Sequence, residues 1–193
     1  MMAQVSKVYV VDDDRDLGAS VARLLNRHGY GAEPFIDPAL LLVAYPEAPA
    51  DCIVTDVMMG DLGGFEFADR IREISPETAI IFMTAWPTTA NAVDSVRRYG
   101  GLDYLEKPLD EERLLTAVAE GVSWSRERRA RIDRTSNLTR RERQVFDLLV
   151  LGHSTKEMAA ILGLSPKTVE DHRAAVMSKT GANGLSQLIK LTQ

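Results

Sequence analysis

The alternation of short apolar runs with amphipathic stretches through residues 1–121 constrains the fold of this 193-residue chain more than any other feature. Short apolar runs bounded by turn-forming residues are typical of buried strands. We predict strands at Lys7–Val11, Cys52–Asp56, Ala79–Thr84 and Leu102–Leu105, and a weaker strand at Tyr30–Phe35.

The stretches between these runs have apolar residues at helical spacing. One such pattern stops at Gly29 and consists of Leu17, Val21, Leu24, Leu25 and His28. Further helices are expected at Pro38–Ala44, Phe65–Glu73, Thr88–Tyr99 and Asp110–Glu120. Because strands that alternate strictly with helices form a parallel sheet covered on both faces, we predict a doubly wound α/β domain with five parallel strands.

The rest of the chain is predicted to be helical. Thr139-x-x-Glu142 and Ser154-x-x-Glu157 are capping boxes, and Ser165-Pro166 combines an N-cap with proline at the first helical position. The short turn Leu162–Ser165 between two predicted helices indicates a helix-turn-helix. The segments expected after residue 121 are a charged helical linker at 122–134 and a small all-helical domain at 135–193.

The net charge of −5 is unevenly distributed along the chain. Residues 1–121 contain 10 Lys+Arg and 21 Asp+Glu, whereas residues 122–193 contain 13 Lys+Arg and 7 Asp+Glu. Mild overall acidity would argue against nucleic-acid binding, but the basic second part is a candidate for binding an anionic polymer.

Composition also limits the cellular setting. A single cysteine, Cys52, excludes a disulfide framework and a cysteine-based structural zinc site. No apolar run reaches the ~18 residues of a membrane span, and the N-terminus lacks a signal-peptide pattern. We therefore expect a cytoplasmic protein without a membrane partner.

Polar residues follow four of the predicted strands, at the end where such a sheet places its ligands. These residues are Asp12, Asp13, Asp14, Asp56, Thr84 and Lys107. Clustered carboxylates repel each other unless a cation lies among them, and a hard divalent ion such as Mg²⁺ prefers oxygen ligands. A lysine and a hydroxyl beside that ion suit a tetrahedral oxyanion, so this set predicts phosphoryl transfer.

Longer motifs surround these residues: Val10-Val11-Asp12-Asp13, Met83-Thr84-Ala85 and Asp103-Tyr104-Leu105-Glu106-Lys107-Pro108. In order and spacing they resemble the CheY-like receiver domain of two-component response regulators, over roughly residues 5–121. The resemblance implies that Asp56 accepts a phosphoryl group from the phosphohistidine of a sensor histidine kinase. It also implies that Thr84 and Lys107 contact the phosphoryl oxygens, and that Tyr104 is an aromatic switch that turns inward with Thr84.

The same resemblance implies a magnesium site. Asp13 and Asp56 would bind Mg²⁺ directly, together with the backbone carbonyl of Met58, and Asp12 would act through water. The chain departs from the family at Gly60, where relatives usually have proline. Because glycine loosens the loop, we expect the Met58 carbonyl to be less well fixed for the metal.

A second departure concerns the residues two positions after Asp56 and Thr84. These are Met58 and Trp86, and both are large and apolar. We hypothesise that they shield an aspartyl phosphate from in-line water, which would give a long-lived phosphorylated state.

Two motifs in the second part, Leu138–Val145 and Ser165–Arg173 with its extension to Gly181, resemble the LuxR-type helix-turn-helix domain. With the receiver, the whole chain resembles the FixJ/NarL subfamily of response regulators. The resemblance implies a four-helix domain that docks one helix in the major groove of DNA and dimerises through its last helix, Leu185–Leu191. The implied partners are promoter DNA, a second copy of the phosphorylated chain, and RNA polymerase.

A helical wheel of the segment after Ser165 separates two faces. The inward face consists of Val169, His172, Arg173, Val176 and Met177, whereas Lys167, Asp171, Ala174, Ala175 and Ser178 point outward. The predicted DNA contacts are Lys167, Thr168, Glu170, Asp171, Arg173, Ala174 and Ser178. We hypothesise that Asp171, which would repel phosphate, accepts a hydrogen bond from the amino group of a cytosine.

These patterns together predict a phosphorylation-controlled transcriptional regulator that is not an enzyme, and two alternatives stay open. Asp12-x-Asp14 resembles the haloacid dehalogenase phosphatases, with Asp12 as nucleophile and Asp14 as general acid. The chain lacks the later acidic pair of that class, and the helix-turn-helix would then be unexplained. The other alternative is a receiver-like module that no longer accepts phosphate and binds DNA constitutively.

Overall fold

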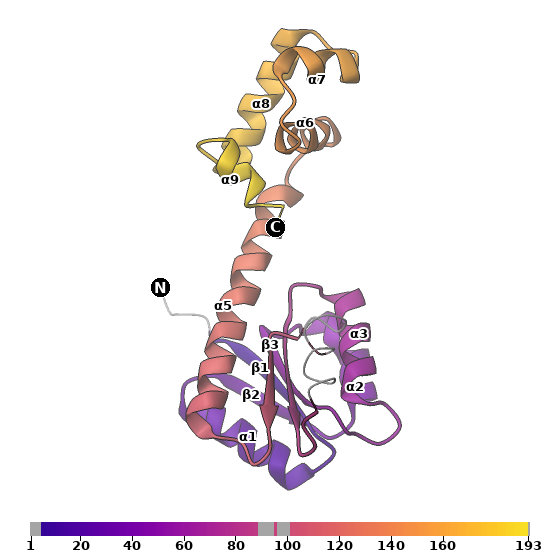
Figure 1. Cartoon of the computed structure of the whole chain (residues 1–193), viewed down its shortest axis with the longest axis vertical. Coiled ribbons are helices and arrows are strands. Elements are labelled where there is room, and N and C mark those ends of the chain that lie inside the picture. Colours follow the sequence, from indigo (N-terminus) through magenta and orange to yellow (C-terminus); the bar gives the residue numbers. More distant parts are fainter. Residues whose placement is uncertain (1–4, 89–94, 96–100, 193) are drawn as a thin grey trace. The chain divides into compact units, whose positions relative to one another are not determined.

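The computed structural model describes residues 5–88, 95 and 101–192 (Figure 1). The chain forms two compact units, one up to Glu127 and the other from Arg128 onward. Across the described residues, none of the helices is both long and apolar enough to cross a membrane.

The first unit contains a five-stranded sheet in the order β2-β1-β3-β4-β5. Every neighbouring pair is parallel, which confirms the predicted sheet. The strands are β1 (Lys7–Val11), β2 (Gly31–Phe35), β3 (Cys52–Asp56), β4 (Ala79–Thr84) and β5 (Asp103–Glu106). All residues of the central strands β3 and β4 are buried, as expected for strands covered on both faces.

Helices cover both faces of this sheet (Figure 1). They are α1 (Arg15–Arg27), α2 (Pro38–Ala44), the short 3₁₀ helix η1 (Tyr45–Glu47), α3 (Gly64–Ile74) and α5 (Glu111–Ser136). Val8 and Val10 of β1 pack in one core with α1 and α5, whereas Tyr9 and Val11 pack in the other with α2 and α3. This alternation along one strand confirms the doubly wound α/β fold. The helix predicted at Thr88–Tyr99 lies, apart from Thr88 and Ser95, outside the described residues.

Helix α5 extends well beyond the helix predicted at Asp110–Glu120, and the charged segment 122–134 continues it without a break. A Cβ added at Gly121 would lie 3.1 Å from Cys52 Sγ, so glycine lets the helix lie close to the sheet. One turn later, the buried Ser125 hydroxyl donates to the backbone carbonyl of Asp51 and accepts from the N–H of Ala79. The helix is therefore packed on the sheet as far as Ser125.

The second unit contains α6 (Arg140–Val150), α7 (Thr155–Leu162), α8 (Pro166–Thr180) and α9 (Leu185–Ile189). This confirms the predicted four-helix domain, although α9 is shorter than expected. Both predicted capping boxes form, at Thr139 with Glu142 and at Ser154 with Glu157. The core comprises residues from all four helices, including Val145, Phe146, Met158, Val169, Val176 and Leu188.

A buried carboxylate links the start of α6 to the end of α8. Glu142, only 6% exposed, accepts from the N–H of Thr139 at 2.7 Å and lies 2.7 Å from Lys179 Nζ at the end of α8. The hydrogen bond from Lys179, helped by the Thr139 N–H, lowers the pKa of Glu142 from about 4.5 to about 2. The interaction stabilises the domain only while Glu142 is ionised.

We therefore predict a pH dependence of stability that Glu142→Gln removes. Because the folded pKa lies below the unfolded one, the stabilisation is fully present above about pH 4.5 and is lost as the pH falls toward about 2. Thermal unfolding of the whole chain, followed by circular dichroism, should show E142Q less stable than wild type at pH 7, with the difference shrinking below pH 4.5. Glu170→Gln, at an exposed acid of α8, should follow the wild-type curve. A constant difference between E142Q and wild type would contradict the prediction.

Candidate functional site

Three carboxylates meet at the carboxyl edge of the sheet. Asp12 and Asp13 follow β1, and Asp56 ends the neighbouring strand β3. One oxygen from each lies within 4.8 Å of the others. Asp12 and Asp56 are buried, at 1% and 6% exposed, whereas Asp13 is exposed. Because two of the three carboxylates are shielded from water, the repulsion between them is strong, and the cluster requires positive charge.

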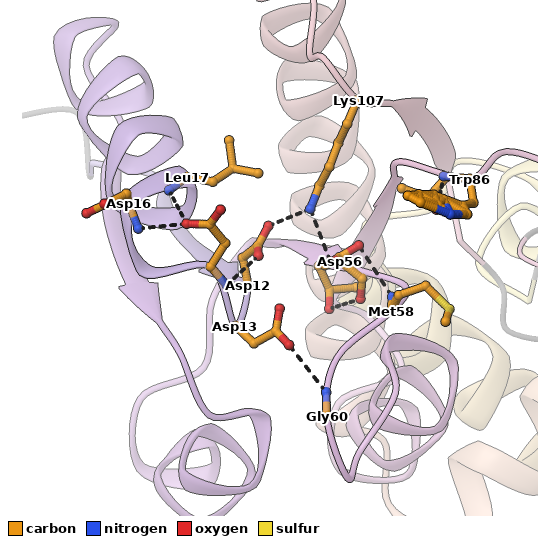
Figure 2. A network of polar contacts seen from close by, with 12 residues as sticks. Asp12, Asp13, Asp16, Leu17, Asp56, Met58, Gly60, Trp86 and Lys107 are labelled. Atoms are coloured by element: carbon orange, nitrogen blue, oxygen red, sulfur yellow. Dashed lines mark hydrogen bonds and ion pairs between the residues drawn. The ribbon is translucent and has the colours of Figure 1, made fainter.

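Lys107 supplies part of that charge from the segment after β5 (Figure 2). Its Nζ lies 2.8 Å from Asp12 Oδ2 and 3.1 Å from Asp56 Oδ2. Burial lowers the pKa of Lys107, but its hydrogen bonds to the two carboxylates outweigh this effect and raise the pKa above its usual value. Burial raises the pKa of Asp12, and Lys107 does not fully offset this rise.

The donor set fits a hard divalent cation. Three carboxylates face one ammonium group, so two negative charges remain to be neutralised. Carboxylate oxygens are the ligands that Mg²⁺ and Ca²⁺ prefer. Asp12, Asp13 and Asp56 would hold such a cation.

Backbone N–H groups fix the three carboxylates in place (Figure 2). The Asp14 N–H donates to Asp12 Oδ1 at 2.9 Å, and the Met58 N–H to Asp56 Oδ1 at 3.4 Å. The Gly60 N–H donates to Asp13 Oδ2 at 3.4 Å. Proline has no N–H, so the departure from the family at residue 60 gives the site a hydrogen bond that proline would remove.

Asp14, which the sequence placed in the acidic cluster, has another role. Its Oδ1 accepts from the N–H groups of Asp16 and Leu17, at 3.0 and 3.1 Å, and it is the N-cap of α1. The expectation that Asp14 joins the cation cluster is therefore wrong. The unpaired N–H groups in the first turn of a helix need a capping acceptor, so the Asp14 side chain points toward them and not toward Asp12.

Thr84 ends β4, the strand beside β3 and its Asp56, and Tyr104 lies on β5, on the far side of β4. The hydroxyl of Thr84, 1% exposed, accepts from the N–H of Trp86 at 3.1 Å. Tyr104 packs against the core shared with α2 and α3, and its buried hydroxyl has no hydrogen-bond partner among the described residues. The ring therefore points inward, and its role as a switch stays a prediction.

Met58 and Trp86 stand on the loops after β3 and β4. They are 69% and 66% exposed, so neither is packed into the core. Figure 2 shows both on the other side of Asp56 from Asp13. Their apolar side chains are therefore exposed on the two loops, and the shielding hypothesis stays a prediction.

The second unit presents α8 as its candidate DNA surface. Of the predicted contacts, five are exposed, namely Lys167, Glu170, Asp171, Ala174 and Ser178. Thr168 is half-buried, and its N–H donates to the N-cap Ser165. Arg173 is half-buried and donates to the Thr155 hydroxyl, which ties α8 to α7. Ala175, expected to point outward, is half-buried.

Both units match known families. Residues 8–119 match the response regulator receiver domain, and residues 136–192 match the luxR family of bacterial regulatory proteins. The chain belongs to the response regulators with a LuxR-type DNA-binding domain.

Relatives of this response regulator share its whole length. It is 35% identical to the transcriptional regulatory protein FixJ of Bradyrhizobium diazoefficiens, over 98% of this chain and 96% of that protein. It is 31% identical to TdiR of Thauera aromatica, over 95% and 84% of the two chains. The crystal structure of full-length FixJ from B. japonicum has a TM-score of 0.57, with 34% identity over 98% of this chain and 97% of that one.

The response regulator is thus a FixJ-like transcriptional regulator of the two-component class and not an enzyme. The phosphatase alternative is therefore wrong. It also required Asp14 as general acid, and that carboxylate caps α1.

Gly64, the first residue of α3, belongs to the site but was not predicted from the sequence. A Cβ at this position would lie 2.0 Å from the carbonyl oxygen of Asp56, so only glycine lets α3 begin directly behind this aspartate. The Gly63-Gly64 pair after the loop was the available signal.

Proposed function

We propose that this response regulator accepts a phosphoryl group on Asp56 from a sensor histidine kinase, and that phosphorylation promotes dimerisation and promoter binding. The observation that carries the proposal is the position of Asp56, which shares a lysine with Asp12 inside a cluster of three carboxylates. A structural ion pair would need only one of these acids.

The chain's own residues account for the chemistry of transfer. A carboxylate oxygen of Asp56 attacks phosphorus, the phosphorus–nitrogen bond breaks, and the imidazole leaves with the electron pair. The Met58 N–H and Lys107 orient the attacking carboxylate through its two oxygens. Lys107 and the Thr84 hydroxyl then hold the oxygens of the transferred group, so the acyl phosphate replaces the carboxylate as the partner of the lysine.

A bound Mg²⁺ would neutralise the charge on the transferred group, and Asp12, Asp13, Asp56 and the Met58 carbonyl would hold it. The support for magnesium is the set of oxygen donors and the charge that Lys107 leaves uncompensated.

Magnesium should stabilise the folded protein through Asp13. At a magnesium concentration 100 times the Kd, the free energy of unfolding rises by about 2.7 kcal/mol. In Asp13→Asn the increase should fall to less than half, because one charged ligand is lost. Thermal unfolding with EDTA or with MgCl₂ measures this, and Asp16→Asn, at an exposed acid of α1, is the matched control. An equal magnesium shift in D13N and wild type would rule out Asp13 as a ligand.

A hollow beside Lys107 supports a kinase contact. Its volume is about 660 Å³, and its apolar lining includes Leu17 and Leu24 of α1 and Pro108 and Leu109 after β5. We assign this surface to the kinase, because a donor docked there reaches the same edge of the sheet as Asp56.

The second unit acts on DNA in this proposal. The exposed face of α8 enters the major groove, with Lys167 and Thr168 at phosphates near the start of the helix. Arg173 contributes mainly by holding α8 on α7. The phosphorylated protein binds promoters as a dimer in the cytoplasm, where it contacts RNA polymerase.

Met58 and Trp86 should set the lifetime of the phosphorylated state. Replacing Trp86 by Ala, or Met58 by Asn, removes an apolar side chain that shields the aspartyl phosphate from water in this proposal. We therefore expect the phosphate to be lost about tenfold faster, which corresponds to a barrier lower by about 1.4 kcal/mol. Loss of radiolabelled phosphate over time measures the rate. Leu40→Ala, at an exposed apolar residue of α2, is the control. Unchanged lifetimes in both variants would refute the shielding hypothesis.

The proposed function is tested by treating the purified protein with a small-molecule phosphodonor and MgCl₂. We expect an acyl phosphate on Asp56, a shift from monomer to dimer in size-exclusion chromatography, and tighter binding of promoter DNA in gel shift. Identical DNA binding with and without the donor would favour the constitutive alternative.

A further inference from the structure

The hydrogen bond from the Gly60 N–H to Asp13 joins two loops at the carboxylate cluster, and Gly60 has no role in the proposed function. Its N···Oδ2 distance is 3.4 Å, and the two residues are 47 positions apart in the chain (Figure 2). Within the parts of the chain that the structure describes, this is the only hydrogen bond of the Asp13 side chain, which has no ion pair there. Lys107, by contrast, contacts both of the other carboxylates, Asp12 and Asp56.

Asp13 is the carboxylate that can turn away from the cluster. Its side chain is exposed, whereas Asp12 and Asp56 are buried. An exposed carboxylate gains rotamer freedom when it turns toward water, and repulsion from the two neighbouring carboxylates favours that movement. One Asp13 oxygen nevertheless lies within 4.8 Å of an oxygen of each neighbour. The Gly60 N–H is the contact that opposes the repulsion and holds the side chain there.

The packing of the loop after β3 fixes this donor. Val57, Met59 and Leu62 belong to the core shared with α2 and α3, and Met59 is only 6% exposed. Because the planar peptide bond ties the Gly60 N–H to Met59, the burial of Met59 sets the direction of the N–H. A Cβ at Gly60 would have no atom within 4 Å, and the φ of Gly60 is outside the left-handed region. Neither space nor backbone conformation requires glycine here, so the property that separates it from proline is the N–H.

We propose that the Gly60 N–H is a positioning group that holds Asp13 beside Asp12 and Asp56 before Mg²⁺ binds, and that it thereby tightens the magnesium site. This inference rests on the proposed function, in which Asp13 is a magnesium ligand. The hydrogen bond leaves room for the metal, because an ionised carboxylate has about four lone-pair sites and the N–H occupies one of them. A side chain that is already in place loses less conformational entropy on binding, which raises the affinity.

Two variants separate the hydrogen bond from the stiffness of the loop. Gly60→Pro removes the N–H and restricts the backbone, whereas Gly60→Ala also restricts the backbone but keeps the N–H. If stiffness alone set the affinity, both variants would bind Mg²⁺ more tightly than wild type. We expect instead that G60P binds about fivefold more weakly, which corresponds to about 1 kcal/mol, and that G60A binds at least as tightly as wild type.

Thermal unfolding of the full-length proteins over a series of MgCl₂ concentrations measures the Kd, because a ligand of the folded state raises the unfolding temperature in proportion to its occupancy. Sodium chloride keeps the ionic strength constant, and the sample in EDTA shows whether each variant folds. If G60P does not fold, an ester in place of the Met59–Gly60 peptide bond removes the N–H without the proline ring and is measured instead.

A double-mutant cycle with Asp13→Ala assigns the effect to Asp13. Alanine offers no side-chain acceptor, so G60P should change the magnesium affinity of D13A by less than about twofold. A loss that persists in the D13A background would assign the effect to the loop and overturn the proposal. Magnesium binding by G60P that equals or exceeds that of wild type would overturn it as well, and would leave the proposed magnesium site intact. Wild type that binds no Mg²⁺ would overturn both.

Discussion

Asp56→Asn should abolish phosphorylation of this response regulator and, with it, every donor-dependent change in assembly and DNA binding. The amide keeps the shape of the side chain and accepts from the Met58 N–H, but it has no nucleophilic carboxylate. Because Asp56 also contributes charge to the cluster, the variant should fold normally and be slightly more stable without metal. Mass spectrometry of the donor-treated protein, size-exclusion chromatography and gel shift measure the three effects.

Two matched variants make this test specific. Asp14→Asn changes an acid in the same loop that only caps α1, and asparagine caps equally well, so this variant should be phosphorylated like wild type. Asp12→Asn removes the other buried carboxylate that Lys107 contacts. Donor-dependent modification that persists in D56N, or that maps to Asp12, would refute Asp56 as the phosphoacceptor.

Lys107→Met should strongly destabilise the first unit. Methionine keeps the apolar stem but leaves the buried carboxylates of Asp12 and Asp56 without their cation. Breaking a buried pair costs about 3–5 kcal/mol, and we expect about 3 kcal/mol here because the Lys107 side chain is 14% exposed. Chemical unfolding in EDTA measures the loss. MgCl₂ should recover part of it, because the metal takes over the neutralisation of the carboxylates.

The same variant should also weaken the response to phosphorylation, since Lys107 no longer holds the phosphoryl group. Lys7→Met is the stability control. Lys7 pairs with Glu33 at 3.8 Å, and the two side chains are 34% and 58% exposed, so its loss should cost less than about 1 kcal/mol. Equal stability of K107M and K7M without metal would show that the lysine does not hold the acidic cluster together.

The sequence predicted the sheet well because β1, β3 and β4 are short, largely apolar runs, and all residues of β3 and β4 are buried. The same holds for the capping boxes at Thr139 and Ser154, since a cap depends on residues three positions apart. The extent of α5 was less predictable. The second half of α5 is charged. Its packing on the sheet as far as Ser125 depends on the Ser125 hydroxyl, which hydrogen-bonds to the backbone of Asp51 and Ala79, far away in the sequence.

Sequence spacing also placed the residues of the site at one edge of the sheet but could not divide their roles. Asp12, Asp13 and Asp14 are consecutive, yet one is buried against Lys107, one is exposed and held by the Gly60 N–H, and one caps α1. The helical wheel placed Arg173 at the inner edge of its helix but could not identify its partner Thr155, which lies on another helix.

By itself the sequence determined the two-domain architecture, the order of strands and helices, and the acids and lysine that meet at the end of the sheet. These follow from periodicity and local capping, which act over a few residues. Only the tertiary structure decided which carboxylates share Lys107 and how far along α5 the packing on the sheet extends. Those features depend on the approach of side chains from distant elements, and that approach is fixed by packing.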